Sequence, residues 1–233
     1  FRAIALNCLE HFQRNEAGLL TRNDPEFVHQ ARVALRRLRS AIKLFAPVLP
    51  ADFVAAYGQT WQTLAAALGE ARNWDVFLSE TLPPFQAAFP SDKDGKRLQK
   101  IAQRKARNAR QSVAVLLAVD EYPRLLLEFT AAVYTLGETL PLPLAEFARQ
   151  QLTRHARKAR QLAKRHANLS PAERHKMRIA FKKLRYTLEF LAPLAKPSQL
   201  RPYLTALASL QDELGQINDH VTAENMVAKA IGN

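Results

Sequence analysis

Two segments of the chain repeat a spacing of histidine and basic residues that is suited to binding anions. On a helix that turns 100° per residue, each set falls within a stripe about 80° wide. The stripes contain His29, Arg32, Arg36, Arg39 and Lys43 in the first segment, and His175, Arg178, Lys182 and Arg185 in the second. Arginine donates paired hydrogen bonds to phosphate oxygens, and lysine acts as a point charge. Hydrophobic residues occupy the opposite side of both predicted helices, so each stripe is expected to face away from the core.

The positive charge of the chain is concentrated in a few segments. Residues 29–43, 93–110, 149–166 and 174–188 together carry a net +25, which leaves −12 for the remaining 167 residues of a chain whose total is +13. Like charges on one helix face repel each other and destabilise the helix. A solvated surface normally mixes signs, so this segregation favours an acidic partner over mere solubility.

The two stripe histidines allow more than one interpretation. His29 and His175 each follow a predicted helix N-terminus by about one turn, where the helix dipole favours anions. Each could be a neutral histidine that is hydrogen-bonded to a neighbour. Each could instead donate a hydrogen bond to a bound anion and take up a proton as it binds. Metal ligation is disfavoured, since one histidine among cations makes a poor divalent-cation site.

The elements that position these residues are predicted to be helices throughout. Ala, Leu, Arg, Lys, Gln and Glu dominate, glycine is scarce, and strand-like runs are absent. Asp24-Pro25 and Ser170-Pro171 each read as an N-cap followed by proline, and Glu173 completes a capping box. The predicted helices are 2–20, 25–46, 51–71, 73–81, 92–118, 122–137, 143–167, 171–192, 198–216 and 218–231. Segments 82–92 and 137–143 are the predicted linkers.

An internal repeat predicts a duplicated bundle. At an offset of 146 residues, 12 identities fall within residues 24–76, among them Pro25, His29 and Arg39 on Pro171, His175 and Arg185. We expect one all-α domain of two repeated antiparallel bundles, with an N-terminal half over 1–138 and a C-terminal half over 139–233.

Four motifs in this order resemble the CHAD domain, the conserved-histidine α-helical domain. Two are the stripe segments themselves. The others are Leu68-Gly69-Glu70-Ala71-Arg72-Asn73-Trp74-Asp75-Val76 and the segment from Leu210 to Asp219. The chain departs from the family pattern at Asn73, where aspartate is usual, and at Glu189, which lies on the second basic stripe.

The resemblance implies a duplicated helical bundle, related by a pseudo-two-fold axis, that binds inorganic polyphosphate in a central basic groove or pore. It also implies association with polyphosphate granules and, in many members, a fused triphosphate-tunnel (CYTH) domain, which would lie outside this chain. In this interpretation the two stripes face each other, and two further helices and one nearby aromatic residue complete the channel. These additional residues are Lys100, Arg104, Arg107, Arg157, Arg160, Lys164 and Tyr186.

The residues favour a binding module over an enzyme. Phosphoryl transfer needs carboxylates that hold metal ions, and the stripes carry only Glu189. We therefore expect no catalytic residues, metal or cofactor. Single-stranded nucleic-acid binders add exposed aromatics to a basic surface, which these stripes lack. RNA binding and an accessory role beside a phosphate-processing enzyme remain the alternatives. The single cysteine, Cys8, and the absence of a long apolar run favour a cytoplasmic location without a membrane span.

Overall fold

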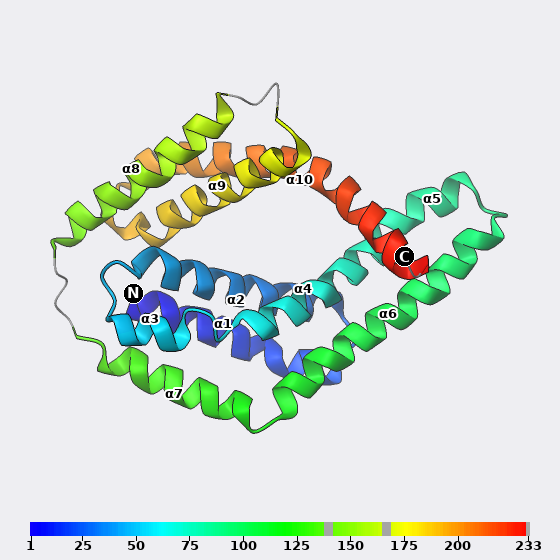
Figure 1. Cartoon of the computed structure of the whole chain (residues 1–233), viewed down its shortest axis with the longest axis horizontal. Coiled ribbons are helices and arrows are strands. Elements are labelled where there is room, and N and C mark those ends of the chain that lie inside the picture. Colours follow the sequence, from blue (N-terminus) through cyan, green and yellow to red (C-terminus); the bar gives the residue numbers. More distant parts are fainter. Residues whose placement is uncertain (138–141, 165–168, 232–233) are drawn as a thin grey trace. The chain divides into compact units, whose positions relative to one another are not determined.

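A computed structural model describes residues 1–137, 142–164 and 169–231, and every regular element in these ranges is helical (Figure 1). The all-α prediction is therefore confirmed. The chain divides into two compact units. Unit 1 contains residues 1–39, 51–136 and the end of the last helix from residue 221. Unit 2 contains residues 40–50 and 137–220.

Unit 1 is built mostly from consecutive helices. They are α1 (Arg2–Thr21), the first part of α2 (Pro25–Phe45), α3 (Ala51–Tyr57), α4 (Gln62–Val76), α5 (Leu82–Ala88), α6 (Lys93–Ala118) and α7 (Glu121–Thr135). A π-helical turn, η1 (Phe77–Thr81), joins α4 to α5. Helices α4 and α6 run side by side over much of their length (Figure 1). This contact places the basic residues of α6 on a helix that is held against α4.

Aromatic side chains form much of the core of unit 1. Phe129 of α7 is fully buried and contacts Phe53, Tyr57 and Trp61, with ring centroids 5.0–5.8 Å apart. Arg2 of α1 donates hydrogen bonds of 2.7–3.2 Å to three carbonyls at the end of α7. These carbonyls have no partner within their own helix, so Arg2 caps α7 and fixes it against α1.

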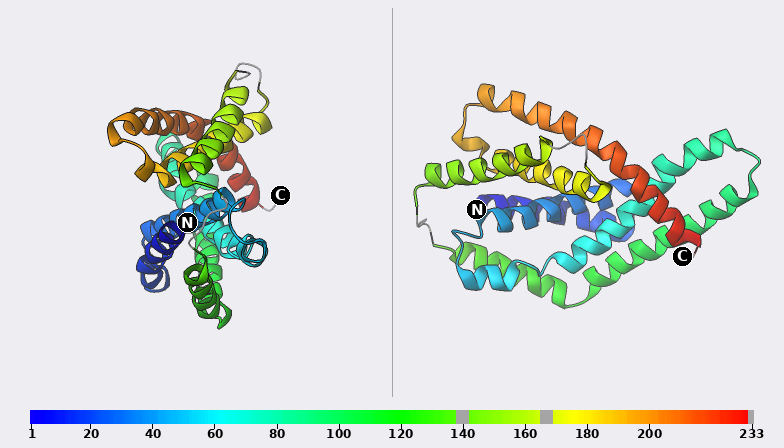
Figure 2. Two further views of the ribbon diagram at one scale, coloured as in Figure 1. Left: turned by 90° about the vertical axis from the view of Figure 1, so that its left-hand side faces the viewer. Right: turned by 45° about the horizontal axis from the view of Figure 1, so that its top comes forward.

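Unit 2 contains the end of α2 and two long helices that lie side by side, α8 (Leu144–Ala163) and α9 (Pro171–Phe190) (Figure 2). A 3₁₀ turn, η3 (Ala192–Leu194), leads into α10 (Pro197–Ile231), whose first part also belongs to this unit. Phe45 of α2 stacks on Phe147 of α8, with ring centroids 5.1 Å apart. Met177 of α9 packs in a cluster with Leu169 and Leu214.

Most predicted helices lie where the sequence placed them. The observed α1, α2, α6, α7 and α9 begin and end within two residues of the predicted ranges. Helix α8 ends at Ala163, and residues 165–168 of the predicted range 143–167 lie outside the described part. Of the predicted linker 137–143, residues 138–141 also lie outside it.

Three predictions of helix boundaries were wrong. The predicted helix 51–71 is interrupted at residues 58–61, and α4 then continues through the predicted break at residue 72. Residues 58–61 form turns, closed by a hydrogen bond of 2.8 Å from the backbone N–H of Gln62 to the carbonyl of Gln59. The burial of Trp74 on the inner face of α4 favours continuation of that helix beyond Asn73. The predicted linker 82–92 contains α5, because prolines are tolerated in a first helical turn. The predicted helices 198–216 and 218–231 are one continuous helix, α10, which includes Pro202 near its start.

In the described ranges, no helix combines the length and the apolar character that a membrane crossing requires.

Candidate anion-binding site

The two basic helices begin as their sequences predict. The carboxylate of Asp24 accepts a hydrogen bond of 2.9 Å from the backbone N–H of Glu26 at the start of α2. Ser170 and Glu173 form a reciprocal capping box at the start of α9. These contacts satisfy N–H groups that a helix leaves without partners at its N-terminus. They fix where each helix starts, and so they fix which side chains share its faces.

Helix α2 separates a buried apolar face from a basic face. The apolar face includes Ala31, Ala34, Leu35 and Leu38, all fully buried. On the basic face His29, Arg32, Arg36 and Arg39 are half-buried, whereas Lys43, in the part of α2 that belongs to unit 2, is exposed. Burial of the apolar face outweighs the repulsion between like charges, which amounts to a few tenths of a kcal/mol per pair.

In unit 1, helix α4 lies beside the first stripe. A Cβ at Gly69 would stand 3.8 Å from Nε of Arg32, which is an ordinary van der Waals distance, so the arginine side chain lies beside α4 at this point. Arg72 is one turn further along α4, where it pairs with Glu80 at 3.6 Å and acts electrostatically on His29. Sequence reasoning missed Arg72 as a member of this basic surface. Its place three residues after Gly69 was the available signal.

The surroundings of His29 disfavour its charged form. Its pKa lies below the usual 6.5 because burial penalises the charge, and because Arg72, Arg36 and Arg32 repel it, although Glu26 acts in the opposite direction. Among the described residues, Nδ1 of His29 is buried and has no hydrogen-bond partner. A bound anion would reverse this balance, because it favours the protonated ring.

Each unit also contains a stripe arginine with a buried donor. Nε of Arg39 in unit 1 and Nε of Arg178 in unit 2 are buried, and neither finds an acceptor in the part of the chain that the structure describes. A buried N–H without an acceptor costs about 1–3 kcal/mol, so most proteins avoid it. A phosphate oxygen would be a suitable acceptor for either guanidinium.

The second stripe, on α9, is partly neutralised. Nε of Arg185 lies 3.1 Å from a carboxylate oxygen of Glu189, one turn further along the helix. Arg178 and Lys182 are half-buried, and His175 is exposed. Tyr186 is buried and stacks on Phe190, with ring centroids 6.0 Å apart, so very little of its surface is open to a ligand.

The supporting cations lie on one helix in each unit. Lys100, Arg104 and Arg107 are exposed on α6 in unit 1, and Arg157, Arg160 and Lys164 are exposed at the end of α8 in unit 2. Within unit 1 the structure brings Arg72 of α4 close to His29 of α2, and within unit 2 it packs α8 against α9. That all four sets line one groove, across a pseudo-two-fold axis, stays a prediction.

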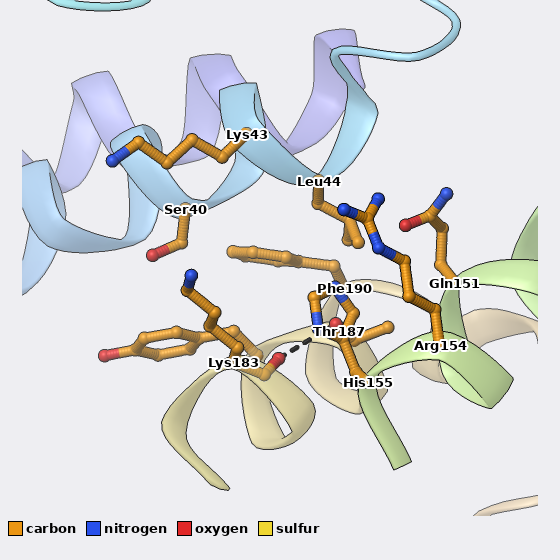
Figure 3. A pocket seen from close by; sticks show the side chains of 10 residues that line it. Ser40, Lys43, Leu44, Gln151, Arg154, His155, Lys183, Thr187 and Phe190 are labelled. Carbon is orange, nitrogen blue, oxygen red and sulfur yellow. Dashed lines mark hydrogen bonds between the residues drawn. The ribbon is translucent and has the colours of Figure 1, made fainter. Parts of the chain in front are cut away.

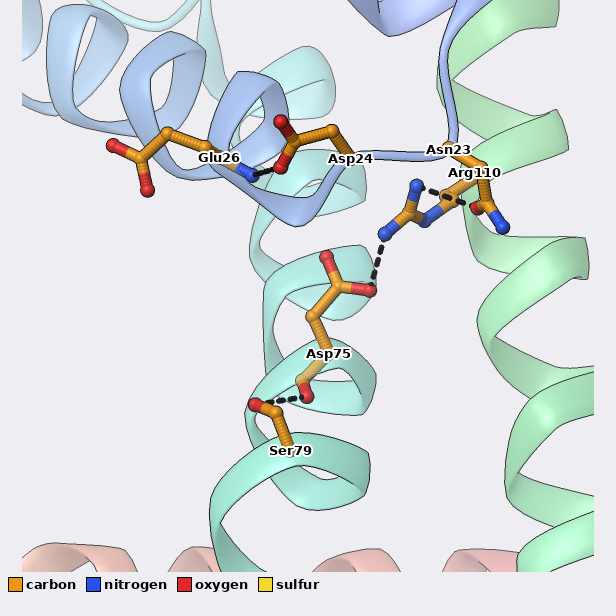
Figure 4. A network of polar contacts seen from close by, with 6 residues as sticks. All are labelled: Asn23, Asp24, Glu26, Asp75, Ser79 and Arg110. Carbon is orange, nitrogen blue, oxygen red and sulfur yellow. Dashed lines mark hydrogen bonds and ion pairs between the residues drawn. The ribbon is translucent and has the colours of Figure 1, made fainter.

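Asp75 takes a structural role in unit 1 (Figure 4). Its carboxylate pairs with Arg110 of α6 at 2.7 Å, and Arg110 also donates to the side chain of Asn23 at 2.9 Å. Arg72, three residues earlier on α4, pairs instead with Glu80. Arg110 ties α6 to α4 and to the loop before α2. The carboxylate is almost completely buried, and it holds the scaffold of the first stripe in place.

Unit 2 contains a pocket of about 250 Å³ between three helices (Figure 3). Basic, polar and aromatic side chains line it: Ser40, Lys43 and Leu44 of α2, Gln151, Arg154 and His155 of α8, and Lys183, Tyr186, Thr187 and Phe190 of α9. Of these, sequence reasoning had selected only Lys43 and Tyr186. Arg154, His155 and Lys183 were missed because they stand outside the 80° stripes, and only the packing of α8 on α9 brings them together.

The comparisons with known proteins agree with one another. A family model described as the CHAD domain matches residues 3–228. The crystal structure of the CHAD domain from the plant Ricinus communis is 36% identical in sequence, with a TM-score of 0.81, and the match covers 98% of this chain and 78% of that one. PptA from Streptomyces chartreusis shares the fold, with 18% identity, a TM-score of 0.68, and coverage of 100% and 84%. No match was found among curated proteins.

Proposed function

This chain belongs to the CHAD domain family, and from that premise we propose that it binds inorganic polyphosphate without catalysing its turnover. The observation that carries the proposal is the pair of buried Nε–H groups on Arg39 and Arg178, one in each basic stripe, with no acceptor among the described residues. A chain of phosphates offers acceptor oxygens at regular intervals. It also relieves the repulsion between like charges along each helix.

The stripes are suited to a linear polyanion without bases. Single-stranded nucleic-acid binders use exposed aromatic rings as stacking platforms. Tyr186, the aromatic residue beside the second stripe, is buried against Phe190. Arginine and lysine thus supply the contacts, and binding should release counterions and weaken steeply with salt.

The proposed role is binding rather than phosphoryl transfer. Metal-assisted transfer needs carboxylates close to the phosphate. Glu189 is the only acid on either stripe, and it is already paired with Arg185. The biological consequence that we propose is attachment to polyphosphate granules in the cytoplasm.

The test is charge reversal on the stripes with a matched control. We expect Arg32→Glu, Arg39→Glu, Arg178→Glu and Arg185→Glu, combined in one variant, to abolish binding of long-chain polyphosphate and to leave the helical circular-dichroism signal intact. The control reverses four arginines outside the stripes, Arg14, Arg22, Arg124 and Arg201, and so lowers the net charge equally. Unchanged binding by the stripe variant, or equal loss in the control, would overturn the site.

A competition experiment separates the alternatives. Long-chain polyphosphate and single-stranded RNA are titrated at equal phosphate concentration and fixed salt. We expect polyphosphate to bind more tightly, and a clear preference for RNA would replace the proposal by RNA binding. Release of orthophosphate in the presence of Mg²⁺ would instead identify the chain as part of a phosphate-processing enzyme.

A further inference from the structure

The pocket in unit 2 has the features of a site for a small anion (Figure 3). Lys43, Arg154 and Lys183 reach it from three different helices, and His155 adds a titratable ring. In Figure 3 the amine of Lys183 and the guanidinium of Arg154 point toward α2, on either side of the Phe190 ring. No Asp or Glu is found among the described residues that line the pocket. Its positive charge is therefore not balanced by the pocket's own walls.

Burial and repulsion between like charges disfavour the protonated forms of Lys183 and His155 at this pocket. The pKa of Lys183 is lowered by burial first and then by the nearby charges of Lys158, Lys43 and Arg154. The pKa of His155 is likewise lowered, by burial and then by Arg154, Lys183 and Lys158. The two groups lie on different helices, α9 and α8, and so the repulsion acts across the α8–α9 contact. An anion with two or more negative charges would remove this repulsion.

The walls of the pocket combine buried apolar side chains with exposed cations. Leu44, Tyr186 and Phe190 are buried, whereas Lys43, Arg154 and Lys183 are exposed to solvent. The hydroxyl of Thr187 donates to the carbonyl of Lys183 at 2.8 Å, within α9 itself. The three cations are therefore open to an anion that enters from solvent.

The pocket is separate from the second stripe although both involve α9. Lys183 and Thr187 lie on a face of the helix turned by about 90° or more from Arg178 and Arg185. A volume of about 250 Å³ also suits a compact molecule rather than a long chain. A ligand held by Lys183 and Arg154 can accordingly be distinguished from one held by the stripe.

We propose that this pocket is a second anion site, which shares Lys43 with the first stripe but is separate from the second, and that it takes a compact anion of the diphosphate class. Two kinds of ligand contain this group: free inorganic diphosphate, and a nucleotide with a diphosphate group, such as ADP. Both offer several oxygens to Lys43, Arg154 and Lys183 at once.

The experiment is a calorimetric titration of the full chain with inorganic diphosphate, at fixed moderate salt. We expect binding of one diphosphate per chain, weakened about tenfold or more by Lys183→Met or Arg154→Met, because a charge-assisted hydrogen bond is lost. Lys183→Arg should retain most of the affinity. Lys176→Met is the matched control, since it removes the same charge from the same helix outside the pocket, and it should change the affinity less than about twofold.

Three results would overturn the proposal, two of them from the variants. One is diphosphate binding that Lys183→Met and Arg154→Met leave unchanged, and the other is an equal loss in Arg178→Met, which would assign the anion to the stripe. Absence of binding by both diphosphate and ADP has the same consequence. Tighter binding of ADP than of diphosphate supports the site and assigns the nucleotide as the source, and equal binding assigns the diphosphate group alone.

The diphosphate proposal and the polyphosphate proposal can be disproved independently of each other. Lys183→Met should keep its affinity for long-chain polyphosphate within about twofold, because the stripe is intact. If the wild-type chain does not bind polyphosphate at all, the diphosphate titration and its variants still decide whether the pocket is a site.

Discussion

The basic helices α2 and α9 share a sequence pattern but differ in how firmly they are held. On α2, the core residues Leu35 and Leu38 are fully buried. At the positions 146 residues later on α9, Phe181 and Leu184 are only partly buried. The same alternation of basic and apolar residues thus supports a tightly packed helix in unit 1 and a more accessible one in unit 2. Amphipathic patterning defines a helix and its faces, but the neighbouring elements decide how much of the apolar face is covered.

A second difference lies at the basic position outside each stripe. In unit 1, Arg37 meets the buried thiol of Cys8, whose pKa is raised to about 11 by burial, although the charge and the hydrogen bond of Arg37 act to lower it. At the offset of 146 residues, Lys183 stands for Arg37, and the nearby charges of Lys158, Lys43 and Arg154 act to lower its pKa. Arg37 therefore meets a thiol, whereas Lys183 meets other cations.

A third difference concerns the end of each stripe. The first stripe ends in Lys43, whereas the corresponding residue of the second stripe is Glu189, which pairs with Arg185 at 3.1 Å. The first stripe therefore contains no acidic residue, whereas the second stripe contains one that pairs with its own arginine. If both stripes bind polyphosphate, they should contribute unequally.

The largest expected effect tests the difference in burial. Leu38→Ala should lower the free energy of unfolding by about 2–5 kcal/mol, because it removes a fully buried side chain and leaves a cavity. Leu184→Ala should cost about half as much or less, since its side chain is already partly exposed. Urea denaturation of the two variants measures both values. Equal losses would mean that α2 and α9 are held equally firmly in solution.

An intermediate effect tests the ends of the stripes. Glu189→Lys gives the second stripe the residue of the first and releases Arg185 from its ion pair. We expect the affinity for long-chain polyphosphate to rise about fivefold, which corresponds to about 1 kcal/mol, with a steeper dependence on salt. Fluorescence titration at several salt concentrations measures both.

The control for this prediction is Glu128→Lys. Glu128 forms the same type of ion pair with Arg124, one turn apart on the exposed surface of α7 and outside both stripes. This variant raises the net charge equally and should leave the affinity nearly unchanged. An equal gain in both variants would attribute the effect to total charge rather than to the stripe.

The smallest expected effect is a dependence of stability on pH, which arises from one histidine in each unit. The pKa values of His29 and His155 are lowered in the folded chain, above all by burial. Below pH 6.5 the unfolded chain therefore binds more protons at these sites, and the free energy of unfolding decreases as the pH falls. The charged groups that act on the two rings are Arg72, Glu26, Arg36 and Arg32 for His29, and Arg154, Lys183 and Lys158 for His155.

Urea denaturation between pH 7.5 and 5.5 isolates each contribution as the difference between wild type and His29→Gln or His155→Gln. Each variant should lose less stability than wild type over this range. Saturating polyphosphate should reduce the contribution of His29, since a bound anion raises its pKa, and saturating diphosphate should do the same for His155. A variant that follows the wild-type curve would show that its histidine does not titrate differently on folding.

Local rules predicted most of the fold. The caps at Asp24 and Ser170 and the periodic apolar residues predicted α2 and α9, because capping and amphipathicity are properties of neighbouring residues. The same rules failed at Asn73, where the burial of Trp74 decides that α4 continues. They failed again at the predicted break in α10, which the helix crosses without interruption.

The sequence by itself determined that this chain is helical, that its charge lies on particular helix faces, and that its motifs resemble those of the CHAD family. These features depend on residues one to four turns apart on one helix, so they can be read from the order of residues along the chain. Only the tertiary structure decided that Arg110 rather than Arg72 neutralises Asp75, and that Arg154 and Lys183 share a pocket. Each of these contacts joins side chains from different helices, and helix packing, unlike helix periodicity, depends on how all the apolar faces of a unit are buried together.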